Sequence, residues 1–313
     1  MLRTRSLACV GTFLALVLAE PVMAADSPLS QVPADTPVLL HMRGLERTKG
    51  RLLAMAKNAL PDLAQQKWDK FDSEIAKVLL GRELKGLPKD GSVFVAIFDP
   101  AEIFAGKVAE YAAIIQVTSY SDFRDATLKA DERKALKQDP AGYEQARIND
   151  QDFYFINREQ YAVVTPSKVL ALRFAKKQAG LDSTLPKDLA GRLLNTDAAV
   201  FLNMVALNKT YAGQIKQFRQ EFEKMMGQSA NLSGPNKNAM EMAQRIATPI
   251  FQGMEDTQAI VASFDFRPEG LKLRIDASVG KDSKTNTLLE DFKSSDFVGL
   301  SKLPTGALVV RHI

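Results

Sequence analysis

Histidine is the side chain that most directly suggests chemistry, and the sequence has only two, His41 and His312. Both stand in short apolar segments that resemble each other, so a histidine pair bridging two repeats could bind a metal ion. The only cysteine is Cys9, and no carboxylate is spaced to complete a set of ligands. The pattern favours strand residues that face solvent or a polar neighbour, and we assign no metal ion and no cofactor.

The sequence lacks the usual motifs of nucleophilic catalysis. A Ser-His-Asp triad would need His41 or His312 as its base, and no Gly-x-Ser-x-Gly turn is present. Ser278 and Lys281 have Ser-x-x-Lys spacing, but we predict that they lie at the end of a strand, where the lysine could not activate the serine. No glycine-rich phosphate loop or dinucleotide fingerprint occurs. We therefore name no catalytic residue.

Two groups of carboxylates have suggestive spacing. Asp69 and Asp72 share one face of a predicted helix that also carries Lys70, which is typical of a solvated charged face. Residues 149–152, Asn-Asp-Gln-Asp, could suggest calcium, but the glycine and the terminal glutamate of a calcium loop are missing. A hairpin turn explains these four residues.

Two segments of the chain repeat an earlier pattern. Residues 35–48 align without gaps to 197–210, and residues 90–99 align to 256–265. Two matches in the same order, at offsets of 162 and 166, indicate a duplication. Identical pairs in the first block are Asp35/Asp197, Val38/Val200, Leu40/Leu202, Met42/Met204, Leu45/Leu207 and Thr48/Thr210; in the second they are Asp90/Asp256, Val95/Val261, Ala96/Ala262, Phe98/Phe264 and Asp99/Asp265.

The hydrophobic pattern gives both copies the same order of elements: strand, two helices, two strands and a short helix. We predict an α+β fold with a mostly antiparallel sheet and helices packed on one face. Copy one adds a hairpin, a third strand and a helix beginning at Pro166. The predicted strands are 38–40, 92–98, 111–118, 143–148, 153–156 and 161–165 in copy one and 200–202, 257–266 and 270–279 in copy two; the short helices lie near 123–128 and 288–292.

The last residues, 303–313, form another apolar segment after a turn and resemble the opening segment 32–42. We expect 307–312 to be a strand that pairs with a strand of copy two, since an unpaired strand this apolar would aggregate. The predicted organisation is a signal peptide at 1–24, a first copy at 25–190 and a shorter second copy at 191–313.

The first 24 residues have the features of a secretory signal peptide. Arg3 and Arg5 precede an uncharged apolar run, 7–18, and Val22-Met-Ala24 supplies small residues before a cleavage site at Ala25. We therefore expect a periplasmic or secreted protein whose mature chain has no thiol, no disulfide and no membrane-spanning segment. An uncleaved anchor is the alternative.

The segment Val32-Pro-Ala-Asp-Thr36, followed by an apolar strand, resembles exported bacterial proteins of unknown function that open with Leu-Pro-Ala-Asp-Thr. The tyrosine-containing strands over 143–165 add to that resemblance. Here Val32 replaces the usual leucine. The family has no assigned activity, so the resemblance implies export and a repeat architecture.

Charge and composition narrow the class of function. The chain has 41 basic and 37 acidic residues, and their mixing argues against a dedicated nucleic-acid surface. Two hypotheses remain: a non-catalytic envelope protein that binds a protein partner or helps an assembly, which we favour, and a hydrolase that uses carboxylates without a motif. We expect the helix methionines to pack in the core, and the alternative is that they form an adaptable binding groove; they are Met225, Met226, Met240, Met242 and Met254. A polar cleft with two facing acids would favour the enzyme, and an apolar groove the binder.

Overall fold

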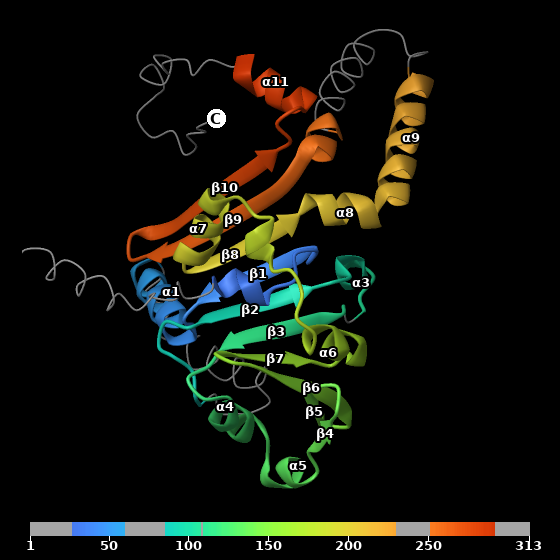
Figure 1. Ribbon diagram of the computed structural model, residues 1–313. Coiled ribbons are helices and arrows are strands. Elements are labelled where there is room, and N and C mark those ends of the chain that lie inside the picture. The colour runs from blue at the N-terminus through green and yellow to red at the C-terminus, as the bar shows by residue number, and fades with distance from the viewer. Residues whose placement is uncertain (1–26, 60–84, 108, 230–250, 292–313) are drawn as a thin grey trace, which may run out of the picture. The chain divides into compact units, whose positions relative to one another are not determined.

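The computed structural model in Figure 1 describes residues 27–59, 85–107, 109–229 and 251–291 of the 313-residue chain. The chain has an α+β fold, as predicted, around a ten-stranded sheet of order β10-β9-β8-β1-β2-β3-β7-β6-β5-β4. Every neighbouring pair along the part of the sheet that runs β1-β2-β3-β7-β6-β5-β4 is antiparallel. The strands are β1 Val38–Arg43, β2 Ser92–Ile97, β3 Tyr111–Gln116, β4 Lys137–Asp139, β5 Tyr143–Ile148, β6 Gln151–Arg158, β7 Tyr161–Thr165, β8 Ala198–Asn203, β9 Thr257–Arg267 and β10 Gly270–Val279.

Helices connect these strands, and their ends follow local capping signals. Ser119 and Ser167 cap α4 and α6 by accepting hydrogen bonds from main-chain N–H groups of the first turn. In the described residues, no helix is long and apolar enough to cross a membrane. The helices are α1 Leu45–Ala59, α3 Pro100–Phe104, α4 Tyr120–Thr127, α5 Ala130–Lys134, α6 Lys168–Phe174, α7 Lys187–Asn195, α8 Met204–Thr210, α9 Ala212–Ser229 and α11 Lys284–Asp291, with 3-10 turns η1 Pro28–Gln31 and η2 Leu181–Ser183.

The strands of the two predicted copies lie in two adjacent groups of the sheet. The first copy contributes β1-β2-β3 and the second contributes β8-β9-β10, with β8 beside β1. Within the first matched block, Leu39 and its counterpart Phe201 are both buried. In the second block the burial differs, since Val261 is buried and its counterpart Val95 is half-buried.

The chain divides into two compact units, residues 1–201 with 261–275, and residues 202–260 with 276–313. These units do not follow the predicted boundary at 190/191. The physical reason is the sheet: because β8 is hydrogen-bonded beside β1, strands of copy two continue the sheet of copy one.

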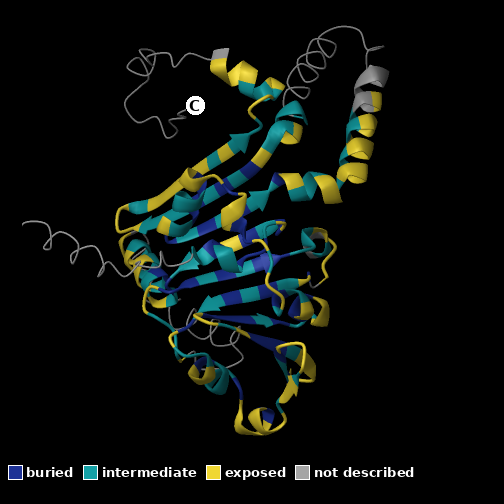
Figure 2. Cartoon of the chain, in the orientation of Figure 1, coloured by how far each residue is buried: buried dark blue, intermediate teal, exposed yellow. Residues whose placement is uncertain are grey.

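The core of the first unit is a row of side chains that crosses five strands on one face of the sheet. Register places His41, Phe94, Ile114, Val163 and Ile156 opposite one another in turn, and all five are buried. Figure 2 shows this concentration of buried residues on the central strands.

Helices cover both faces of this sheet, a wider arrangement than the single helical layer that we expected. The backbone of Leu193 in α7 reaches His41 on one face. On the other face, Phe123 of α4 packs against Ala162, the neighbour of Val163. Successive strand residues point to opposite faces, so α7 and α4 lie on opposite sides.

Most predicted strands agree with the structure, and 143–148, 161–165 and 270–279 match to the residue. The four-residue turn at 149–152 is corrected to two residues, because Asn149 and Asp150 take positive φ angles of 48° and 64° while Gln151 already belongs to β6. The helix predicted from Pro166 begins at Lys168 because Ser167 caps it. The signal peptide, the second helix of copy one and the terminal strand lie outside the described residues. Of the second helix predicted for copy two, which includes Phe251, the structure describes residues 251–256, and these are helical.

Candidate functional site

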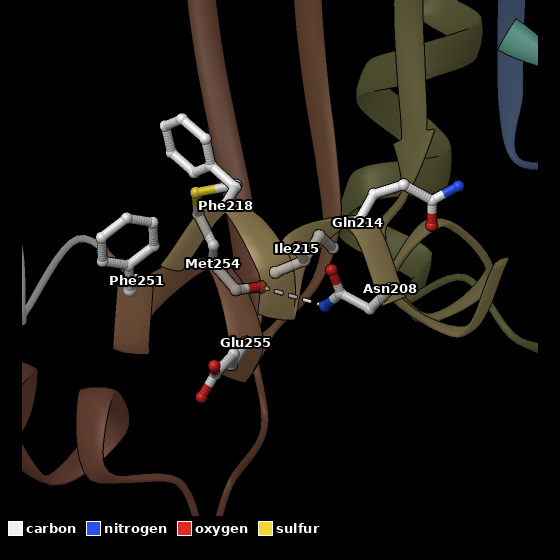
Figure 3. Close-up of a pocket in the computed structure, with 7 residues that line it drawn as sticks. All are labelled: Asn208, Gln214, Ile215, Phe218, Phe251, Met254 and Glu255. Carbon is white, nitrogen blue, oxygen red and sulfur yellow. Dashed lines mark hydrogen bonds between the residues drawn. The ribbon is translucent and has the colours of Figure 1, made fainter. Parts of the chain in front are cut away.

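An apolar groove in the second unit is the candidate site. It lies between α9 and the helical residues 251–256 that precede β9, and has a volume of about 240 Å³. Figure 3 shows the side chains that line it, which are Asn208, Gln214, Ile215, Phe218, Phe251, Met254 and Glu255.

The helical repeat places the apolar lining. Ile215, Phe218 and Phe222 are three and four residues apart, so they share one face of α9. The Phe251 ring lies edge-on to the rings of Phe218 and Phe222, at centroid distances of 6.0 Å and 5.6 Å. This geometry is favourable for aromatic pairs and fixes the floor of the groove.

The lining is nevertheless open to solvent. Phe218 is 60% exposed and Met254 is 43% exposed. Exposed aromatic and methionine side chains that share one concave surface are typical of a binding site, since methionine adapts to different ligands.

Polar contacts hold the rim in place. The Asn208 side-chain amide donates a 3.1 Å hydrogen bond to the Met254 carbonyl, joining α8 to the segment before β9. Arg219 of α9 forms a 2.8 Å ion pair with Glu255. Arg219, with Lys216, also borders an adjoining groove of about 340 Å³ that shares Asn208, Ile215 and Glu255 with the first. The ionic groups of the rim therefore hold the walls in place.

A buried carboxylate, Asp197, lies at the centre of a polar cluster in the first unit. Its side chain accepts hydrogen bonds from Arg51 at 2.8 Å and 3.1 Å and from the Phe266 N–H at 2.9 Å. Its main-chain carbonyl accepts from the Thr48 hydroxyl and the Arg43 N–H. Because these donors occupy both of its oxygens, the carboxylate is suited to hold β1, α1, β8 and β9 together.

A second buried polar group is His41. The expectation that it faces solvent is wrong, because it faces the core, but it does have a polar neighbour, Ser92. Its ring stacks on Phe94 and its Nε2 lies 3.3 Å from the Ser92 hydroxyl. Burial lowers its pKa to about 4, the Leu193 backbone opposes this shift and Arg43 adds to it. His41 is therefore neutral at physiological pH.

Other acids pair with arginines or main-chain donors. Glu144 accepts hydrogen bonds from Tyr120 and Arg124 at 2.8 Å and 2.9 Å. Hydrogen bonds from the Ala141 backbone and Tyr143 lower the pKa of Asp139, and those from Thr285 lower the pKa of Asp256. A general acid needs the opposite shift, toward a raised pKa.

The residues singled out from the sequence are not brought together. Ser278 lies near the end of β10, as predicted, and Lys281 follows the strand. The Asp150 side chain is 97% exposed at its turn, and in the described ranges no three potential metal ligands are grouped. His312, Asp69 and Asp72 lie outside those ranges.

The spacing of Ile215, Phe218 and Phe222 in the sequence is that of one helix face, but the spacing does not show whether that face is exposed. Of the methionines that we considered, Met254 lines the groove, while the side chains of Met225, Met226, Met240 and Met242 lie outside the described residues. A stripe of apolar residues has the same spacing whether it faces a core or a groove. The feature of the sequence that could have indicated a binding groove was the combination of aromatic and methionine residues in these two helical segments.

Comparisons with known proteins assign neither a family nor a function to this chain. No family model matches the sequence, and no curated protein matches it. One solved structure, described as crystal form III of TP0453, is similar over 84% of this chain and 85% of that one, with 12% sequence identity and a TM-score of 0.35. We take neither fold nor function from a similarity of this size.

Proposed function

We propose that this chain is an exported, non-catalytic protein that binds an apolar segment of a protein partner in the cell envelope. The observation that carries the proposal is the groove of α9, whose floor is apolar and partly exposed while its ionic rim is internally paired. The signal-peptide pattern of residues 1–24 supports export to the periplasm or beyond.

The chemistry of the groove indicates what it would bind. Phe218, Phe251 and Met254 offer apolar contacts, and the Asn208 amide and Glu255 are already engaged in holding the walls. Apolar side chains of a protein segment would gain most from displacing water here, as aromatic residues commonly dominate binding energy at interfaces.

The test is site-specific photo-crosslinking in the native host, with benzoylphenylalanine in place of Phe218. Val169, 69% exposed on α6 of the first unit, is the matched control position. We expect a protein crosslinked from position 218 but not from 169, and we expect Met254→Glu to abolish that crosslink. A crosslink alone is not sufficient, so the captured partner is then purified and titrated.

In that titration, Phe218→Ser should weaken binding about tenfold or more, as for a central interface aromatic, while Val169→Ser leaves it unchanged. Equal crosslinking from both positions, or binding that Phe218→Ser does not change, would overturn the proposal. Hydrolysis of ester, peptide or glycoside substrates by the purified mature chain would favour the carboxylate-dependent hydrolase instead.

A further inference from the structure

The adjoining groove, of about 340 Å³, lies beside the candidate site on the other side of Ile215. Ala212, Lys216 and Arg219 are four and three residues apart, so they share the side of α9 that borders this second groove. Phe218 is two residues from Lys216, which in an α-helix places it on nearly the opposite side, in the first groove. Ile215 lines both grooves and lies between them.

The charges around the second groove do not cancel. Arg219 and Glu255 neutralise each other in their 2.8 Å ion pair. Lys216 is exposed, and within the part of the chain that the structure describes its ammonium has neither an ion pair nor a hydrogen bond. Its neighbours three and four residues away on the helix are not acidic; they are Ala212, Gly213, Arg219 and Gln220. One positive charge is therefore available to a ligand.

The acid already present in the lining limits which anion this groove suits. The Glu255 carboxylate repels a group with several negative charges, such as a phosphate, more strongly than it repels a single carboxylate. Lys216 offers a point charge on a flexible stem, which is enough for one carboxylate. The side chains of Ala212 and Ile215 add apolar surface beside it. The chemistry indicated is a carboxylate on an apolar carrier.

We propose that the protein segment that binds in the groove of Phe218 carries an Asp or Glu side chain that passes Ile215 and pairs with Lys216. This inference rests on the proposed function and names the chemistry of its partner. Apolar anchors provide most of the affinity at such a surface. An exposed ion pair adds little affinity, but it selects among partners and speeds association. The partner segment is therefore apolar on one side and acidic on the other.

The first test uses random peptides displayed on phage and selected against the purified mature chain. We expect the selected peptides to combine apolar residues with Asp or Glu. Selection against Lys216→Glu should instead yield Lys or Arg in place of the acid. The matched control is Lys224→Glu, at an exposed lysine of α9 that lines neither groove, and it should yield acidic peptides as the wild type does. Acidic residues no commoner than in the starting library, or the same preference from Lys216→Glu, overturn the proposal.

Titration of one selected peptide separates this inference from the proposed function. Phe218→Ser tests whether the peptide occupies the groove, and Lys216→Glu tests whether the acid pairs as proposed. If Phe218→Ser weakens binding and Lys216→Glu does not, the proposed function stands and the acidic requirement is wrong. If Phe218→Ser changes nothing, the peptide binds elsewhere and both proposals fail.

A double-mutant cycle tests the pairing itself. Lys216→Gln in the protein, or the matching amide in place of the peptide's acid, should each weaken binding about threefold at low salt. Both changes together should weaken it no further, because each alone already breaks the same pair. High salt should remove the difference between the wild type and Lys216→Gln. Losses that simply add would place the acid elsewhere and overturn the proposal.

A fatty acid is the competing ligand, because it also joins a carboxylate to an apolar chain. A small ligand needs a site that encloses most of its surface, whereas Phe218 is 60% exposed here, which suits a segment of a larger partner. We therefore expect dodecanoate, below its micelle concentration, to leave the bound peptide in place. Displacement by dodecanoate that Lys216→Glu abolishes would assign the site to a lipid carboxylate and overturn the proposal.

Discussion

At the residue scale, Asp35 and Asp197 hold matching positions in the two copies but have opposite environments. The Asp35 side chain is 69% exposed and forms an ion pair with Arg173. The Asp197 side chain is 1% exposed and accepts hydrogen bonds from Arg51 and the Phe266 N–H. The same residue type therefore contributes differently to the stability of the fold at the two positions, because removing a buried charged partner destabilises a protein more than removing an exposed one.

Replacement of these two residues measures that difference. Asp197→Ala removes the acceptor for Arg51 and leaves the Phe266 N–H unpaired, so we expect a loss of about 2–4 kcal/mol in the free energy of unfolding. The matched variant Asp35→Ala should cost less than about 1 kcal/mol, as for an exposed ion pair. Urea denaturation of both variants checks this, and equal losses would contradict a structural role for Asp197.

The buried His41 makes stability depend on pH. The folded chain binds a proton on this ring only near pH 4, whereas the unfolded chain binds it near 6.5. Unfolding therefore takes up a proton between these values, and stability falls as the pH is lowered from 6.5 to 4, by about 3 kcal/mol in total.

His41→Asn removes this titration, and asparagine is the residue that copy two has at the matching position, Asn203. We expect the variant to show a shallower loss of stability across that range, measured by denaturation at several pH values. The variant's stability at neutral pH is a separate quantity, so only the slope is compared. An unchanged slope would show that His41 is not the group that titrates.

At the element scale, two-residue turns set the register of the hairpins. Glu159 connects β6 to β7 with a φ of 58°, a left-handed conformation that costs side chains with a Cβ roughly 1–2 kcal/mol. Glu159→Gly should therefore raise the free energy of unfolding by about 0.5–1 kcal/mol. Gln160, the other turn residue, has no positive φ, so Gln160→Gly should lower stability instead. Thermal or urea denaturation of the pair gives the sign of each change.

Strands bounded by turn residues were predictable to the residue, as 143–148 and 270–279 show, because glycine, proline and aspartate mark where pairing stops. The helix α7 was not predicted, since its apolar residues Leu189 and Leu193 are few and acquire their role from packing onto β1. The sequence also could not predict on which face of the sheet His41 lies. Apolar residues flank it on the strand, and a shift of one residue reverses every side chain.

The candidate site was predictable only in part, for a similar reason. The stripe of Ile215, Phe218 and Phe222 follows from helical spacing, but its exposure depends on which element covers it. Phe251 is 29 residues further along the chain than Phe222, and its position against α9 is a tertiary contact that no local pattern encodes.

At the scale of the whole molecule, the predicted duplication would account for the size of the sheet better than it accounts for function. The predicted first copy, 25–190, supplies β1 to β7 and the predicted second copy supplies β8 to β10, and because β8 lies beside β1 the two groups form one continuous sheet. The apolar groove belongs to copy two, which lacks the added hairpin, third strand and helix of copy one. The groove is formed by residues of α8 and α9 and by residues 251–255, all of which belong to the predicted second copy.

The proposed envelope role depends on a prediction for the whole chain, which is that it is exported. A signal peptidase requires small residues at −3 and −1, which here are Val22 and Ala24. The mature protein in the envelope fraction of the native host should therefore begin at Ala25, as mass spectrometry or N-terminal sequencing would show. Ala24→Arg places a large charged residue at −1, so the uncleaved precursor should accumulate, whereas Ala25→Ser should be processed normally. An intact Met1 on the mature wild-type protein would instead identify the apolar run 7–18 as an uncleaved anchor.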